Sequence, residues 1–132
     1  DFCGIRNYAF QSGEQISFTV FYNVIGLYVN AGNATFTVNA EKLNNTPVYH
    51  LVGAGNSNSS YDWIFKVRDK YESYIDTANL QPLKFLRNVD EGGYKINENV
   101  TFNRAANTAT SEKGTVKVPN CVQDVLSAIY YS

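Results

Sequence analysis

Apolar and polar side chains alternate one by one along much of this chain, and this period of two limits the folds that it can adopt. In the segment 16–22, apolar residues take the even positions, whereas Ser17 and Thr19 take two of the odd ones. The segment 34–40 repeats the pattern. Because successive side chains of a β-strand point to opposite faces, the alternation predicts half-buried antiparallel strands.

Further short strands are expected along the rest of the chain, at 48–52, 70–75, 83–89, 94–102 and 115–118. Turn-forming residues gather between the expected strands, at 30–33, 44–47, 53–60, 76–82, 91–93 and 104–114. For residues 62–69 the pattern of apolar residues fits either a short helix or a bulged strand. With ten Tyr and eight Phe, a meander of seven or eight strands is expected to curl. The predicted fold is mainly β, a curved half-barrel or barrel-like sheet.

The period changes near the C-terminus, where a helix is predicted. Apolar residues recur there at helical spacing: Val122, Val125, Leu126, Ile129 and Tyr130. Asn120 stands where an N-cap residue would be, and Asp124 falls in the first turn. The apolar face of this helix is unfinished at Ser132. We therefore expect residues 1–132 to be one domain and the N-terminal part of a longer natural one.

The charge and hydropathy of the chain argue against several classes of protein. The net charge is −1 and charged residues make up 17% of the chain. A nucleic-acid binder needs a basic face to neutralise phosphates, so that class is not expected. No apolar run approaches the roughly 18 residues that a transmembrane helix needs.

The two cysteines, Cys3 and Cys121, stand near opposite ends of the chain. Such a pair, in a chain that begins at Asp1 rather than at Met, predicts a disulfide bond and an exported protein without its leader. The alternative is a cytosolic domain with two unrelated thiols.

The chain shows no arrangement of residues typical of an enzyme. His50 is the only histidine and has no partner nearby in the sequence to orient it, so a structural or exposed histidine is favoured over a catalytic one. A zinc site would need three or four His or Cys ligands, and no metal or other cofactor is expected. The acids between Asp62 and Asp76 alternate with Lys and Arg, which is typical of a solvated face with ion pairs.

Four motifs follow one another along the chain: the N-terminal Cys followed by Phe10-x-x-Gly13-Glu14-Gln15-Ile16, the stretch Ala31-Gly32-Asn33-Ala34, the run from Val67 to Asp76 leading to Leu80-Gln81-Pro82, and Cys121-Val122-Gln123-Asp124-Val125. In this order they resemble one family of exported bacterial proteins, known as domain-of-unknown-function family 3108, and especially its Bacteroidetes members. The resemblance implies a signal peptide, a location in the periplasm or at the cell surface of a Gram-negative bacterium, and a longer natural chain. It also implies a curved sheet similar to that of periplasmic lipoprotein carriers.

The function expected first is a binding module whose concave sheet takes a lipid or another apolar or amphiphilic molecule. The candidate ligand-binding residues are the inward apolar positions of three strands: Phe18, Val20, Tyr22, Phe36, Val38 and Phe85. The alternative is a structural component of the envelope that docks a partner protein through sheet edges or exposed Tyr. An enzyme acting on envelope glycans or lipids is a third hypothesis.

Overall fold

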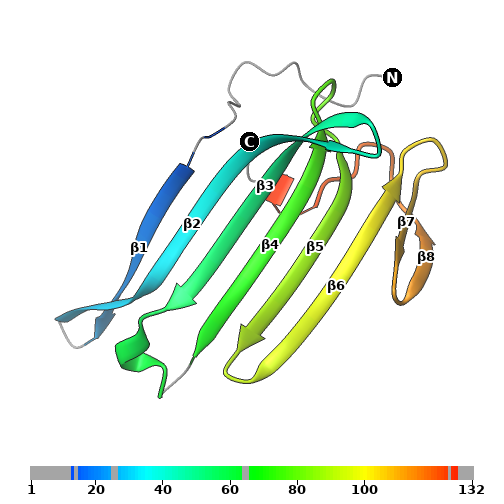
Figure 1. Cartoon of the computed structure of the whole chain (residues 1–132). Helices are drawn as coiled ribbons and strands as arrows, with labels where there is room; N and C mark the ends of the chain where they lie inside the picture. Colours follow the sequence, from blue (N-terminus) through cyan, green and yellow to red (C-terminus); the bar gives the residue numbers. More distant parts are fainter. Residues whose placement is uncertain (1–12, 14, 25–26, 64–65, 125, 128–132) are drawn as a thin grey trace.

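The computed structural model describes residues 13, 15–24, 27–63, 66–124 and 126–127. The chain forms one antiparallel sheet of eight strands, which pair in the order of the sequence (Figure 1). The strands are β1 (Gln15–Val24), β2 (Leu27–Leu43), β3 (Thr46–Ser57), β4 (Val67–Asp76), β5 (Pro82–Glu91), β6 (Tyr94–Asn103), β7 (Thr108–Ser111) and β8 (Gly114–Lys117). One turn of 3-10 helix, η1 (Ser59–Tyr61), connects β3 to β4.

The sheet is open, with β1 and β8 as its two edges. The predicted mainly β antiparallel meander is confirmed. The barrel-like alternative is wrong for the part of the chain that the structure describes. Closure would require the edge strands to pair along their length, and β8 has only 4 residues against the 10 of β1.

Two of the predicted turns join neighbouring strands as tight hairpins. Leu43 pairs with Thr46, so the β2–β3 turn has two central residues, Asn44 and Asn45, with φ of 50° and 70°. Gly92 and Gly93 fill the same places between β5 and β6, with φ of 62° and 91°. Positive φ at both central residues is typical of type I′ turns, whose twist matches that of the strands.

Other segments that were predicted to be turns belong to strands. β2 runs through residues 30–33 and β3 continues to Ser57, while β7 lies inside 104–114. A Cβ on Gly32 would lie 2.2 Å from the backbone oxygen of Asn56, so glycine allows β2 and β3 to approach closely here. The β1–β2 register shifts beside this point, between Val20 and Phe21. The Gly and Asn residues therefore mark an irregularity within a long hairpin rather than its end.

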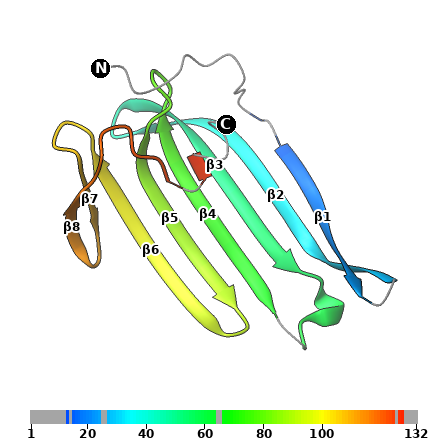
Figure 2. The same cartoon turned by 180° about the vertical axis from the view of Figure 1, so that it is seen from behind.

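One face of the sheet, here called the covered face, carries the core. Cross-strand partners line up in a row from β2 to β6, namely Val38, Leu51, Ser73, Phe85 and Val100. Val38 and Leu51 are fully buried. Leu126, from the C-terminal segment that follows β8, joins the same cluster. The view from behind shows this segment crossing the sheet (Figure 2). The C-terminal segment thus supplies the second layer of the core.

The predicted C-terminal helix is not confirmed: residues 122–124 are not helical, Leu126 and Ser127 are in helical conformation, and residues 125 and 128–132 lie outside the described residues. The prediction of Asn120 as N-cap is wrong, because Cys121 has a φ of 67° and cannot be a first helical residue. Asp124 takes the capping position instead. No helix of the described part of the chain has the length and apolar character that crossing a bilayer requires.

Candidate ligand-binding pocket

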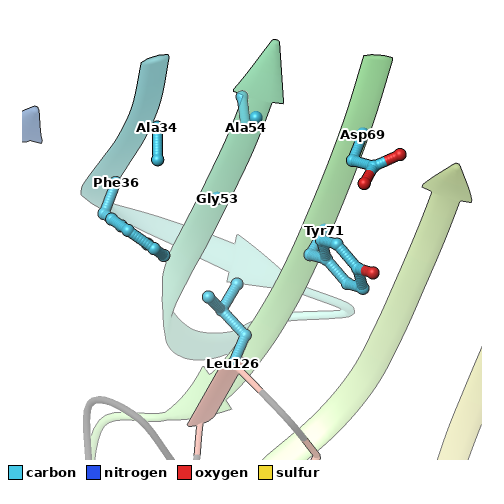
Figure 3. Close-up of a pocket in the computed structure, with 8 residues that line it drawn as sticks. Ala34, Phe36, Gly53, Ala54, Asp69, Tyr71 and Leu126 are labelled. Atoms are coloured by element: carbon cyan, nitrogen blue, oxygen red, sulfur yellow. The ribbon is translucent and has the colours of Figure 1, made fainter. Parts of the chain in front are cut away.

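A pocket of about 330 Å³ lies on the covered face, over β2, β3 and β4. Its lining residues are Ala34, Phe36, Gly53, Ala54, Gly55, Asp69, Tyr71 and Leu126. Figure 3 shows Leu126 reaching from the C-terminal segment between Phe36 on β2 and Tyr71 on β4, with Asp69 further along β4. All but two of the lining side chains are apolar or absent, so most of the pocket suits hydrocarbon.

Two glycines at successive inward positions of β3 make room for the pocket. Gly53 pairs with Phe36 and Tyr71, and Gly55 pairs with Ala34 and Asp69. A side chain at either position would enter the space above β3. A Cβ built on Gly55 meets nothing within 4 Å. The glycine-rich stretch of the sequence is therefore the floor of an apolar pocket.

A buried polar contact holds the C-terminal segment on the sheet. The Ser73 hydroxyl donates a hydrogen bond to Asp124 Oδ2 at 2.6 Å, and both residues are buried. The backbone N–H of Ser127 donates to Asp124 Oδ1 at 2.7 Å, while the Asp124 N–H donates to the Ser127 hydroxyl at 3.1 Å. This reciprocal pair is a capping box. It sets the turn that directs Leu126 into the pocket wall.

Burial and hydrogen bonding act against each other on Asp124. Burial raises the pKa of this carboxyl, whereas the hydrogen bonds from Ser127 and Ser73 lower it, and the net direction is upward. Arg104 lies near enough for the Asp124 charge to act on its pKa, but both of its bonded nitrogens donate to the Pro82 carbonyl, at 2.9 and 2.6 Å. The buried acid is thus held mainly by neutral hydroxyl and amide donors.

Asp69 gives the pocket a polar end. Its Oδ1 accepts a hydrogen bond from the backbone N–H of Asp90 at 3.2 Å. Burial, a hydrogen bond with Glu91 and the negative charge of Glu91 raise the pKa of Asp69 to about 6, in that order of importance. Two neighbouring carboxyl groups, one on the half-buried Asp69 and one on the exposed Glu91, favour the uptake of a proton or of another positive group.

A charged pair lies beside the pocket on the same face. Arg87 pairs with Tyr71 across β4 and β5, and with Glu98 across β5 and β6. Its Nη2 lies 3.5 Å from Glu98 Oε1. Burial raises the pKa of the Tyr71 hydroxyl, and the charge of Asp69 adds to the rise. The Arg87 guanidinium is thus paired with Glu98 through Nη2, while its buried Nε has no hydrogen-bond partner in the described part of the chain.

The six apolar residues that were predicted to bind ligand do not lie together in one site. Phe36 lines the pocket. Val38 and Phe85 belong to the core cluster next to it and are 0% and 8% exposed. The side chains of Phe18, Val20 and Tyr22 lie outside the described part of the structure. The two glycines, Asp69 and Tyr71 were missed, because their meeting depends on the pairing of β3 with β4.

His50 lies on the opposite face and has partners that the local sequence did not reveal. Its Nδ1 contacts Glu41, and its Nε2 lies 2.9 Å from Glu72 Oε1. The ring stacks on Tyr74, with centroids 4.3 Å apart. Both ring nitrogens therefore face carboxylates of the neighbouring strands β2 and β4. The arrangement fits a structural role, one of the two that were favoured for this histidine.

The acids between Asp62 and Asp76 are spread over different parts of the molecule. Asp62 binds Arg68 in the β3–β4 connection, with Oδ2 and Nη2 2.6 Å apart. Hydrogen bonds from Ser57 and Arg68 lower the pKa of this carboxyl. Asp69 faces the pocket and Glu72 faces His50. Of these acids, Asp69 alone lines the described pocket, which therefore holds no pair of them in the manner of a glycosidase. Within the described ranges, no cluster of three or more His, Cys, Asp or Glu side chains is arranged to hold a metal ion.

The comparisons with known proteins give one match. The model of the family described as "Protein of unknown function (DUF3108)" matches residues 17–132. No curated protein and no solved structure matches the chain. The family match covers every strand of the sheet except the first two residues of β1, and it includes all the residues that line the pocket.

Proposed function

Since the chain belongs to the DUF3108 family, whose description assigns no activity, we propose a function from the geometry of the pocket. The protein is a binding module for an apolar or amphiphilic molecule. The observation that carries this proposal is the apolar pocket over Gly53 and Gly55, closed on one side by Leu126. Its volume of about 330 Å³ falls at the lower end of the range for ligand sites, about 300–1,000 Å³.

A binding assay with a fluorescent apolar probe, N-phenyl-1-naphthylamine, tests the proposal. The probe gains fluorescence in apolar surroundings, and we expect saturable binding to the protein. In Gly55→Leu, the new side chain fills the open space above β3, and the affinity should fall by about tenfold or more, since most of the buried apolar contact is lost.

Asn56→Leu is the matched control, because Asn56 is the next residue of β3, exposed, and faces the other way. It should leave the affinity of the probe unchanged. Circular dichroism checks that both variants keep their β content. Probe binding that does not saturate, or that is equal in Gly55→Leu and the parent, would contradict the proposal.

An exported location in the cell envelope is part of the proposal. It is supported by the two cysteines near the chain ends and by the resemblance to an exported family. Fractionation of cells that express the natural gene, with the protein followed by antibody, tests it. Recovery in the cytosolic fraction would contradict it.

A second candidate function, docking of an envelope protein, is favoured by two exposed aromatic side chains. Trp63 in the β3–β4 connection is 83% exposed, and Tyr94 at the start of β6 is 68% exposed. Their loops meet, because the Gly92 N–H donates to the Lys66 carbonyl at 2.7 Å. Exposed aromatic residues are enriched at interfaces. If this function holds, a stoichiometric partner from envelope extracts should bind the parent and not the Trp63→Ser/Tyr94→Ser variant.

A further inference from the structure

The polar end of the pocket is formed by one acidic side chain, that of Asp69. Asp69 has Gly55 on β3 and Val89 on β5 as its direct cross-strand partners. None of the described lining residues carries a positive charge. The polar group of a ligand that fills the pocket would therefore lie beside the Asp69 carboxyl. No lining residue in the described ranges offers this carboxyl a cationic partner.

The neighbouring charges reinforce this acidity. Glu91 faces the same side as Asp69 from β5 and shares a hydrogen bond with it. Arg87, further along β5, has its guanidinium 3.5 Å from Glu98. On β4, the next residue of this face is Tyr71, a neutral hydroxyl. β2 contributes Ala34, and the C-terminal segment contributes Leu126.

The chemistry of this end distinguishes between polar groups on a ligand. In a hydrogen bond from an ammonium group to a carboxylate both partners are charged, whereas in one from a hydroxyl only the carboxylate is charged. A carboxylate group would add a third negative charge beside Asp69 and Glu91, at a place where water screens it only in part. The apolar part of the pocket favours the hydrocarbon chain of all three kinds of molecule equally.

We propose that the pocket selects amphiphiles with a cationic, hydrogen-bond-donating head group, primary alkyl amines in particular, over fatty-acid anions. This inference rests on the proposed function, since it assigns the head group of a ligand whose chain occupies the apolar pocket. Asp69 is the specificity-determining residue, and Glu91 supports it from β5. The raised pKa of Asp69 agrees with a site that lacks its positive partner.

The test compares three amphiphiles with the same twelve-carbon chain: dodecylamine, dodecanol and dodecanoate. Each displaces N-phenyl-1-naphthylamine from the protein at pH 7.5, below the concentration at which it forms micelles. We expect dodecylamine to bind more tightly than dodecanol, and dodecanol more tightly than dodecanoate. The affinities of the amine and the acid should differ by about tenfold or more, as for a partly buried charge interaction.

Two variants identify the residue responsible. Asp69→Asn keeps the shape of the side chain and removes its charge, and it should reduce the preference for the amine to about threefold or less. Glu112→Gln removes one charge from the β7–β8 turn, far from the pocket lining, and should leave the preference unchanged. In the parent, the affinity for dodecylamine should fall at pH 5, because Asp69 then carries a proton.

The outcomes separate the two proposals. If none of the amphiphiles displaces the probe, the proposed binding function fails. If dodecanoate binds as tightly as dodecylamine and Gly55→Leu abolishes both, the pocket stands and the head-group inference is overturned. An amine preference that survives Asp69→Asn unchanged overturns it as well.

Discussion

Gly53 and Gly55 occupy successive inward positions of β3, but the space above them differs. A Cβ on Gly53 would lie 3.1 Å from Phe36 Cε1 and 3.3 Å from Leu126 Cδ1. A Cβ on Gly55 would meet no atom within 4 Å. Neither glycine has a positive φ, so alanine fits the backbone at both positions. The two sites differ only in packing.

Alanine at these positions should therefore have unequal effects on stability. Gly53→Ala crowds Phe36 and Leu126, and such overpacking typically costs about 1–3 kcal/mol. Gly55→Ala is the matched control, with the same gain in strand propensity and no crowding. We expect the free energy of unfolding in urea to be lower for Gly53→Ala than for Gly55→Ala. Equal free energies of unfolding would show that Phe36 and Leu126 move aside for the added methyl group at no cost in stability.

Asp69 makes the stability of the protein depend on pH. The folded protein holds the proton of Asp69 up to about pH 6, whereas the ordinary pKa is 3.8. Between these values the folded state binds more protons than the unfolded chain, so stability falls as the pH rises. We expect the free energy of unfolding of the parent, relative to Asp69→Asn, to fall between pH 4 and 6 and to level off above. A difference that rises over this range would contradict the raised pKa.

At the residue scale, the residues named from the sequence include one that lines the pocket, Phe36, and not the others. Phe36 was predicted from the alternation of its own strand. Asp69 looked like one more surface acid, because nothing in the segment 62–76 shows that Gly55 lies opposite to it. The register of a sheet joins residues that are distant in the sequence. The pattern within one strand shows which side chains share a face, but it does not show which residue of the next strand lies opposite each of them.

The β2–β3 hairpin ends in a turn that is not fully optimised. Asn44 and Asn45 both take positive φ, which Asn tolerates better than most residues and Gly tolerates best. Asn-Gly is the preferred pair for a type I′ turn. Asn45→Gly should raise the free energy of unfolding by about 0.5–1 kcal/mol, and Asn45→Ala should lower it by a similar amount. Thermal unfolding measures both, and a loss of stability in Asn45→Gly would contradict this turn assignment.

At the scale of elements, the sequence predicted most strands but misplaced the ends of two. β2 extends over 17 residues and β3 over 12, because each continues through Gly and Asn residues that are typical of turns. Backbone pairing with the neighbouring strand outweighs these local preferences. The short strand β7 was hidden for a similar reason, since residues 104–114 are mostly polar.

For the molecule as a whole, the predicted disulfide would tie the chain start to the C-terminal segment. Cys121 stands three residues before Asp124, whereas Cys3 lies outside the described residues, so the pairing stays a prediction. A bond that closes a loop of about 100 residues is expected to stabilise a domain by about 4.7 kcal/mol in the chain-entropy model.

Reduction of this bond should lower the melting temperature by several degrees. Mass spectrometry of the native protein after alkylation, without a reducing agent, should show no modified thiol. The Cys3→Ser/Cys121→Ser variant should melt at the temperature of the reduced parent and be insensitive to dithiothreitol. Two alkylated thiols in the native protein would rule the bond out.

The pairing of every strand with its neighbours in the sequence also has a consequence for how the protein folds. Hairpins between adjacent strands close short loops, whereas the hydrogen bond from Ser73 to Asp124 joins residues 51 positions apart. Because loop closure costs more entropy over longer separations, we expect the sheet to assemble first and the C-terminal segment to dock afterwards. The wall that Leu126 provides would then be the final part to form, so the chain acquires its sheet before it acquires its pocket.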